Sequence, residues 1–171
     1  MRKMLFVNWL EEMKLMNSLR CRLVSKEINA SNTVVVAVST DYSSVIAQYL
    51  RHQLSHDGEI CAGFGVDVPY PDQEFDDEFV SDICSMFTMN FQAIKDKKIL
   101  LVEAGVIRGG NYTKIVELIK DKMQLPNEIL TLTMFENYGS KFKSDFVGRY
   151  YDDSTEDLTF WWEKPNNHWP S

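Results

Sequence analysis

The sequence predicts an α/β fold in which a parallel sheet is flanked by helices. Apolar runs rich in β-branched residues alternate along the chain with segments in which apolar residues recur every three or four positions. The first pattern is typical of buried strands and the second of amphipathic helices. Strands that alternate with helices form a parallel sheet with right-handed crossovers. The length of 171 residues suits one domain, which at this size buries roughly 70% of its unfolded surface.

The first elements are a predicted helix, strand, helix and strand. Apolar residues at helical spacing predict an amphipathic helix over residues 9–28. The run Thr33–Val38 is apolar and largely β-branched, which favours a strand that is covered on both faces. Ser43 or Ser44 can cap a helix with one apolar side, and residues 59–66 form the second predicted strand. An acidic loop that contains prolines follows.

The remaining elements continue the alternation. Apolar residues at almost every fourth position between 75 and 94 predict a helix with an apolar stripe. Residues 98–103 form the third predicted strand, a loop with glycines leads into a helix around Ile115, and residues 128–135 form the fourth strand. Beyond these elements short strands and loops predominate. We therefore expect a single domain, which consists of a core over about 1–136 and a small C-terminal hood over about 137–171.

Composition and charge restrict the possible functions. The net charge of −7 argues against sequence-independent binding of nucleic acid, because such binding depends on Lys and Arg side chains that neutralise phosphates. No apolar run approaches the ~20 residues of a membrane span, and the early stretch Met4–Leu10 is too short for a signal peptide. The three cysteines, Cys21, Cys61 and Cys84, fit no zinc spacing. We expect them to be reduced and mostly buried in a cytoplasmic protein that contacts no membrane.

We expect the functional site at the loops that follow the strands, because ligands of open parallel sheets bind beyond the carboxyl ends of the strands. Two loops qualify, 39–44 and 103–112. The second contains Gly109 and Gly110 directly before a helix. Glycines there let backbone N–H groups approach an anion, and the helix N-terminus adds partial positive charge. Arg108 and Lys114 are candidates for further charge, whereas the alternative is that the glycines only form a tight turn.

The segment Val102–Asn111 resembles the ribose-5-phosphate loop of type I phosphoribosyltransferases, in which an apolar strand and two acidic residues precede Thr-Gly-Gly-Thr. Further segments stand in the order used by the xanthine-guanine (6-oxopurine) branch, namely Phe6–Trp9, Val36–Ser39, Ser144–Gly148 and Phe160–Glu163. The resemblance extends over nearly the whole chain. It implies the phosphoribosyltransferase fold, a homo-oligomer, and a magnesium-dependent reaction of phosphoribosyl pyrophosphate with a 6-oxopurine.

The resemblance also implies a role for each matching residue. Glu103 would meet the ribose hydroxyls and magnesium. The phosphate-binding positions are Arg108, Gly109, Gly110, Asn111 and Tyr112. The pyrophosphate-loop positions are Ser39, Thr40, Asp41 and Tyr42, and the base-pocket positions are Asn137, Phe146 and Val147.

Several of these positions depart from the family pattern. Ala104 replaces the second acidic residue, and Ile107 stands where an acid near the purine N7 is usual. Asp41 and Tyr42 replace a cation and glycines, which opposes close approach of pyrophosphate. The acidic segment 72–82, at the position of the mobile loop of relatives, contains no Lys or Arg.

The purine pocket departs as well. Asn137 takes the place of the Lys that holds the purine O6, and Asp157 that of a stacking aromatic residue. Tyr138, Phe146 and Trp161 are alternative stacking residues.

These departures predict a phosphoribosyltransferase-like protein of the purine type that is catalytically impaired or inactive. General acid–base help alone is typically worth about 10²–10⁴-fold in rate. Such a pseudoenzyme would act by binding a nucleotide, another phosphorylated ligand or a protein partner, and would need no cofactor. The alternative is an active purine salvage enzyme that uses magnesium, because Glu103, Gly109 and Gly110 are kept. A third hypothesis is an unrelated nucleotide-binding module of flavodoxin-like type.

Overall fold

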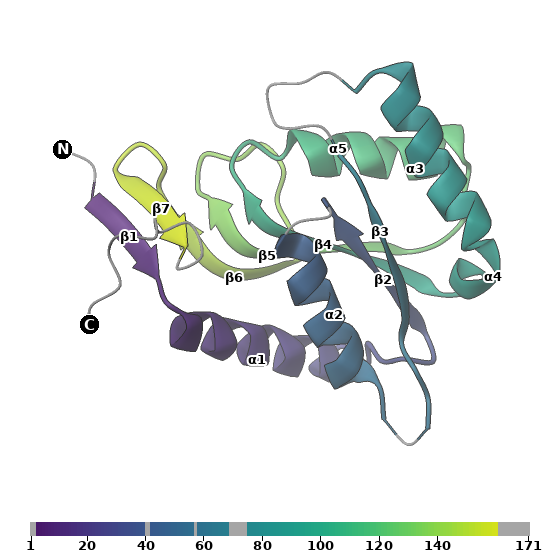
Figure 1. The fold of residues 1–171 in the computed structure, drawn as a ribbon, viewed down its shortest axis with the longest axis horizontal. Helices are drawn as coiled ribbons and strands as arrows, with labels where there is room; N and C mark the ends of the chain where they lie inside the picture. The colour runs from purple at the N-terminus through teal and green to yellow at the C-terminus, as the bar shows by residue number, and fades with distance from the viewer. Residues whose placement is uncertain (1–2, 40–41, 57, 69–74, 161–171) are drawn as a thin grey trace, which may run out of the picture.

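The computed structural model describes residues 3–39, 42–56, 58–68 and 75–160. In chain order the elements are β1 (Lys3–Val7), α1 (Trp9–Ser25), β2 (Thr33–Val38), α2 (Tyr42–Leu54), β3 (Ala62–Val66), α3 (Asp77–Met89), α4 (Phe91–Ile94), β4 (Lys98–Val106), α5 (Gly110–Glu117), η1 (Leu118–Lys122), β5 (Ile129–Asn137), β6 (Phe146–Tyr151) and β7 (Glu156–Phe160) (Figure 1).

A five-stranded sheet forms the centre of the molecule, with strand order β3-β2-β4-β5-β6. Every neighbouring pair in it is parallel. Helices α1 and α2 cover one face, and α3, α4, α5 and η1 cover the other (Figure 1). This arrangement confirms the predicted α/β fold.

Strand β2 shows why the sheet is parallel and buried. All six of its residues are buried. Val35 packs in the core on the α1–α2 side, whereas Val34 and Val36 pack on the α3–α5 side. Because successive side chains of a strand point to opposite faces, an uninterrupted apolar run requires a layer of helices on each side.

Several boundaries differ from those that the sequence predicts. The helix predicted over 9–28 ends at Ser25, and the strand predicted from residue 59 begins at Ala62. The helix predicted over 75–94 is two helices that meet at Asn90, whose side chain donates to the Met86 carbonyl 2.8 Å away. Strands β4 and β5 run to Val106 and Asn137, beyond their predicted ends.

Part of the predicted acidic loop is helical. The side chain of Asp76 accepts hydrogen bonds from the Glu78 and Phe79 N–H groups and caps α3. Asp77 and Glu78 occupy the first turn, where carboxylates are stabilised by the helix dipole. This part of the acidic run therefore has a structural role, while residues 69–74 lie outside the described residues.

The predicted C-terminal hood, over about 137–171, contains β6 and β7 among the described residues. Strand β6 joins the main sheet beside β5, and β7 pairs with β1 in a separate two-stranded parallel sheet (Figure 1). Among the described strands, the β1–β7 pair thus lies outside the main sheet, although Leu5 and Val7 of β1 still pack in the core. In the terminal motif, Trp161, Trp162 and Glu163 lie outside the described residues.

Candidate functional site

A cavity of about 420 Å³ lies where β4 ends and α5 begins. It is lined by Glu103, Gly105, Val106, Ile107, Arg108, Gly109, Gly110 and Asn111. Small-molecule sites typically measure roughly 300–1,000 Å³. The structure thus brings Glu103 and four of the five predicted phosphate-binding residues together around one concave surface, at the carboxyl edge of the sheet.

Gly109 shapes the entrance to α5. Its φ is 79°, in the left-handed region that favours glycine, and it forms the N-cap of the helix. A Cβ added there would lie 2.2 Å from the Cβ of Phe142 and 2.9 Å from Ser140 Oγ. Backbone conformation and packing both require glycine at this position.

Two other glycines leave the cavity open. A Cβ added at Gly105 or at Gly110 would meet nothing within 4 Å. The N-cap residue of α5 supplies no side-chain acceptor, and the first N–H groups of a helix have no acceptor within it. The N–H groups at the start of α5 are thus suited to bind an anion in the cavity.

The side chain of Tyr112, one of the predicted phosphate-binding residues, lies in the core. Its side chain is fully buried, and its hydroxyl donates to the Leu132 carbonyl. Burial raises the pKa of this phenol well above its ordinary value, and the nearby carboxylates of Glu103 and, less strongly, Glu136 add to the effect. Only the backbone of Tyr112 can therefore contact a phosphate, because its ring belongs to the core.

Glu103 and Ala104 lie on opposite faces of β4. Glu103 is half-buried and lines the cavity. Ala104 packs against the core on the α1–α2 side, and its N–H donates to Ser43 Oγ at 3.0 Å. This bond ties the start of α2 to β4, so the two loops that the sequence singles out are neighbours.

The charged residues near the glycines contribute unequally. Arg108 is exposed and lines the cavity, where Ile107 forms an apolar wall. Lys114 instead lies with its Nζ 5.0 Å from the centre of the Phe75 ring, a cation–π contact. Arg108 is therefore the cation of this loop that is available to a ligand.

The predicted pyrophosphate loop is described only in part, since Thr40 and Asp41 lie outside the described residues. Ser39 has a φ of 76°. Such a conformation costs a residue other than glycine about 1–3 kcal/mol and is often found at functional sites. The Tyr42 hydroxyl donates to the buried carboxylate of Glu12 in α1. The ring is thus held towards α1, and this contact gives no support to the expectation that Tyr42 blocks pyrophosphate.

The predicted base-pocket residues do not meet at the cavity. The Asn137 side chain is buried and accepts the Gly139 N–H at 3.0 Å, which closes the turn after β5. Phe146 and Val147 stand opposite Leu132 and Thr133, near the start of β6. The strand register places Phe146 and Val147 level with Val102 and Glu103 of β4, and neither lines this cavity, so their place in a base pocket stays a prediction.

Phe146 lines a different hollow, at the opposite edge of the sheet. The Arg22 guanidinium lies 5.7 Å from the centre of its ring, and an Arg22 N–H donates to the Val147 carbonyl at 2.7 Å. This hollow also includes Lys98 and Asp145. The matching segment Ser144–Gly148 thus serves to place β6 against α1.

The structure adds residues that the sequence did not indicate. Phe142 contacts Gly109 and lies 5.2 Å from Tyr112, ring centre to ring centre. Tyr138, a candidate for stacking on a base, instead stacks on Tyr150 at 5.2 Å and 16°. Both tyrosines are exposed. Their stacking depends on the register of β5 and β6, which a single sequence does not reveal.

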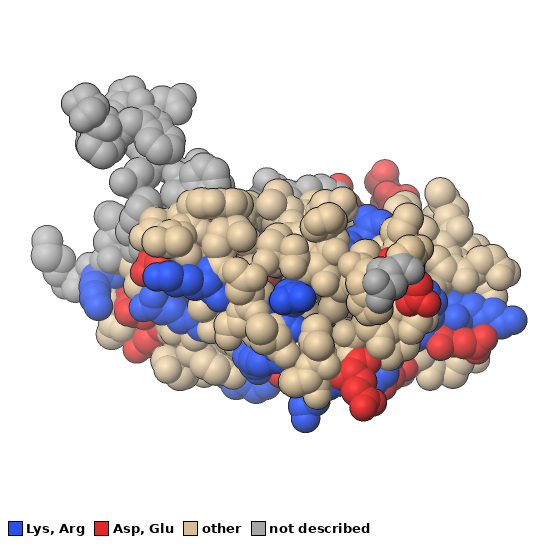
Figure 2. All heavy atoms as spheres, turned by 90° about the horizontal axis from the view of Figure 1, so that it is seen from below, with Lys and Arg blue, Asp and Glu red and all other residues tan. Residues whose placement is uncertain are grey.

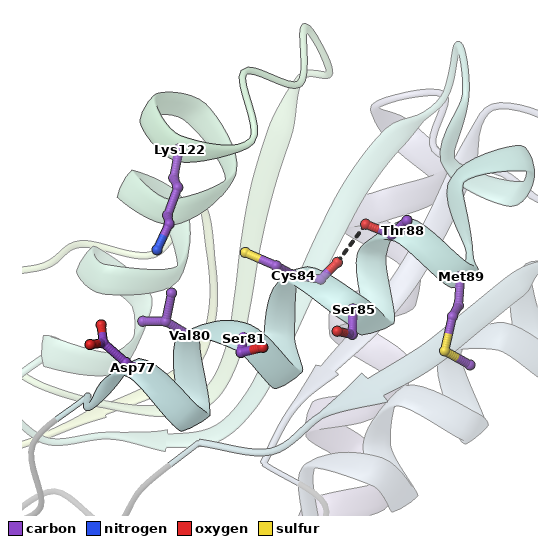
Figure 3. A pocket seen from close by; sticks show the side chains of 8 residues that line it. All are labelled: Asp77, Val80, Ser81, Cys84, Ser85, Thr88, Met89 and Lys122. Atoms are coloured by element: carbon purple, nitrogen blue, oxygen red, sulfur yellow. Dashed lines mark hydrogen bonds between the residues drawn. The ribbon is translucent and has the colours of Figure 1, made fainter.

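A second hollow, of about 650 Å³, lies along the outer face of α3. Figure 3 shows Asp77, Ser81, Ser85 and Thr88 spaced along this helix, with Lys122 of η1 at one end. The Thr88 hydroxyl is used within the helix, where it donates to the Cys84 carbonyl at 2.8 Å. Because these polar groups do not converge on one point, the cavity at Gly109 is the better candidate site.

On the face that Figure 2 shows, Lys and Arg side chains are interspersed with Asp and Glu. This face therefore presents charges of both signs. Among the described residues, no helix has the length and hydropathy needed to cross a membrane.

No family model matches the chain, and no curated protein matches it in sequence. Among solved structures, it is similar to a purine phosphoribosyltransferase from Pyrococcus horikoshii Ot3, with 17% identity and a TM-score of 0.67 over 99% of this chain and 100% of the other. It is also similar to a Helicobacter pylori xanthine-guanine-hypoxanthine phosphoribosyltransferase, with 15% identity and a TM-score of 0.63 over 95% and 94%. The chain therefore has the fold of the type I phosphoribosyltransferases, and the two structures named here are phosphoribosyltransferases of the purine type.

Proposed function

We propose that this protein binds a purine nucleotide through its 5-phosphate at the cavity lined by Glu103–Asn111, and that its phosphoribosyl transfer is impaired or absent. The observation that carries the proposal is the glycine-lined start of α5. Gly109 turns the chain into the helix, Gly110 leaves space for an anion, and Arg108 lines the same cavity.

The binding chemistry follows from these groups. A phosphate accepts hydrogen bonds from the N–H groups at the start of α5, and the Arg108 guanidinium adds a charge-assisted contact. Hydrogen bonds to a charged group are worth about 1.5–3 kcal/mol each. The Glu103 carboxylate accepts hydrogen bonds from ribose hydroxyls, which fixes the sugar beside the phosphate.

Transfer is impaired because the cavity offers few chemical groups to the purine base. Glu103 is the single acidic residue that lines the cavity among the described residues, and Ile107 presents an apolar wall. The Asn137 side chain is already engaged in a turn. With Glu103 assigned to the ribose hydroxyls, a purine held here has no second carboxylate among the described lining residues to accept its proton, as general base catalysis requires.

Among the described residues that line the cavity, Glu103 is the carboxylate suited to ligate the magnesium ion that an active phosphoribosyltransferase would need. Mg²⁺ usually takes one or two carboxylates and completes its coordination with waters and substrate phosphates. Within the described part of the chain no group of three or more metal-ligating side chains is present. Glu103 would be the carboxylate of this cavity that ligates a magnesium ion bound together with phosphoribosyl pyrophosphate. The ion would neutralise part of the charge of that substrate.

We also propose that the protein is a cytoplasmic homo-oligomer. Trp9 and Leu10, at the start of α1, are 51% and 63% exposed, and such side chains favour contacts between subunits. Sedimentation of the purified protein tests the oligomeric state, since a single species of about 20 kDa would be a monomer and would contradict the proposal.

Two experiments test the proposed function. Calorimetry with guanosine monophosphate and with guanosine measures binding, and we expect the nucleotide alone to bind measurably. Incubation with magnesium, phosphoribosyl pyrophosphate and guanine, xanthine or hypoxanthine measures pyrophosphate release, and we expect little or none. Rapid release that is lost in Glu103→Gln would instead establish the active enzyme, while absence of nucleotide binding would refute the binding role.

A further inference from the structure

Glu136, the penultimate residue of β5, is a charged side chain that the proposed function does not use. It is fully buried. Its Oε2 accepts the Ser144 N–H at 2.8 Å, and its Oε1 lies 3.6 Å from Lys143 Nζ. A carboxylate is costly to bury and persists only with such partners. These contacts hold the carboxylate in one place beneath residues 138–145, the segment that joins β5 to β6.

The segment 138–145 is closed by its own hydrogen bonds. Lys143 Nζ donates to the Tyr138 carbonyl at 3.0 Å, and the Ser140 hydroxyl donates to the Phe142 carbonyl at 2.8 Å. The Ser140 N–H donates to the Asn137 carbonyl at 2.9 Å. Lys143 thus connects the first part of the segment to Glu136, and the segment is fixed at both of its ends.

The same segment supports the start of α5. Phe142 and Ser140 approach Gly109 so closely that a Cβ on Gly109 would lie 2.2 Å and 2.9 Å from them. The Phe142 ring also packs on Tyr112 in the first turn, with ring centres 5.2 Å apart. The backbone that would bind phosphate therefore rests on residues 140–142.

We propose that Glu136 is a positioning residue for the phosphate site. By holding Lys143 and Ser144, it keeps the segment 138–145 against Gly109, and so keeps the N–H groups of α5 in the arrangement that binds an anion. The proposal rests on the proposed function, since it concerns the same site. Glu136 touches no ligand itself, because it is fully buried and does not line the cavity.

The test compares Glu136→Ala with the conservative Glu136→Gln and with a matched control. Glu128 stands near the start of β5 and pairs with Lys98 at 3.1 Å, but it is exposed. Glu128→Ala thus removes an ion pair of the same type at the opposite edge of the sheet. We expect Glu136→Ala to weaken binding of guanosine monophosphate by roughly tenfold or more. Glu136→Gln, which can still accept the Ser144 N–H, should recover most of the affinity, and Glu128→Ala should bind as the unmodified protein does.

Hydrogen exchange makes the test independent of the ligand. The Thr113 N–H donates to the Gly109 carbonyl at 3.1 Å in the first turn of α5. In Glu136→Ala we expect exchange of the amides in residues 107–117 to be faster by roughly tenfold, and in Glu128→Ala to be unchanged. If Glu136→Ala does not fold, the exposed Lys143→Met gives the same readout.

The outcomes separate the two proposals. Absence of nucleotide binding in the unmodified protein refutes the proposed function, and the exchange of residues 107–117 then decides the role of Glu136. Unchanged exchange in Glu136→Ala, or in Lys143→Met if the first variant does not fold, overturns the positioning role. A Glu136→Ala protein that binds guanosine monophosphate as tightly as the unmodified protein overturns it as well.

Discussion

Replacing Gly109 with alanine tests the geometry of the phosphate site in isolation from any ligand. The left-handed backbone at Gly109, with a φ of 79°, costs a residue with a Cβ roughly 1–2 kcal/mol. The new methyl group would also lie 2.2 Å from the Cβ of Phe142, and overpacking of this kind typically costs about 1–3 kcal/mol. We therefore expect Gly109→Ala to lower the free energy of unfolding by about 2–5 kcal/mol.

Urea unfolding followed by tryptophan fluorescence measures this change, and Gly110→Ala is the matched control. A Cβ at Gly110 meets nothing within 4 Å, and the φ of Gly110 is not positive. Gly→Ala at a compatible position stabilises by about 0.4–1 kcal/mol, so we expect equal or higher stability but weaker nucleotide binding, because the methyl group enters the cavity. A Gly109→Ala protein that unfolds at the same urea concentration as the unmodified protein would refute the reasoning.

Two further predictions concern buried groups. Tyr112→Phe removes the hydroxyl that donates to Leu132 and should cost about 0.5–1.5 kcal/mol near pH 7. Because the pKa of Tyr112 is raised in the folded protein, the stabilisation by its hydroxyl is complete below the unfolded pKa of about 10 and declines at higher pH. Between pH 9 and 11 the urea midpoint of Tyr112→Phe should therefore fall less steeply than that of the unmodified protein. Equal slopes for the two proteins would contradict this prediction. Iodoacetamide should modify the exposed Cys21 well before the buried Cys61. Burial raises the pKa of the Cys61 thiol, although the charges of Arg51 and Lys97 lower it. Peptide mass spectrometry measures the two modification rates, and equal rates would contradict the burial of Cys61.

Features that depend on neighbouring residues could be predicted from the sequence. The six buried residues of β2 are predicted because an uninterrupted β-branched run is informative by itself. The glycine pair at the start of α5 is predicted for the same reason, since a strand, a short loop with two glycines and a helix follow one another along the chain. The alternation of such elements is sufficient to predict the class of fold.

Features that depend on distant residues could not be predicted. Tyr42 donates to Glu12, which is 30 positions away, and Phe142 packs on Gly109 across the turn after β5. The position of Phe146 in a motif does not reveal that its ring faces Arg22, in a hollow that also includes Lys98 and Asp145. Strand register and the face that a side chain occupies are properties of the assembled sheet.

The cysteines show the same limit. The sequence predicts mostly buried thiols, whereas Cys21 is exposed, Cys84 is half-buried and only Cys61 is buried. Cys21 lies on the solvent side of α1, while Met16, Leu19 and Leu23 on the same helix reach the core. The exposure of a small apolar residue depends on the side of the helix on which it lies. Residue type alone does not determine it.

The most direct test of the central claim is the amide spectrum of the isotope-labelled protein during titration with guanosine monophosphate. If the start of α5 binds phosphate, the Gly109, Gly110 and Asn111 amide resonances should shift with the nucleotide, and the same resonances should stay in place with guanosine. Shifts that are equal for nucleotide and nucleoside, or that are confined to residues far from Glu103–Asn111, would contradict a phosphate site at these glycines.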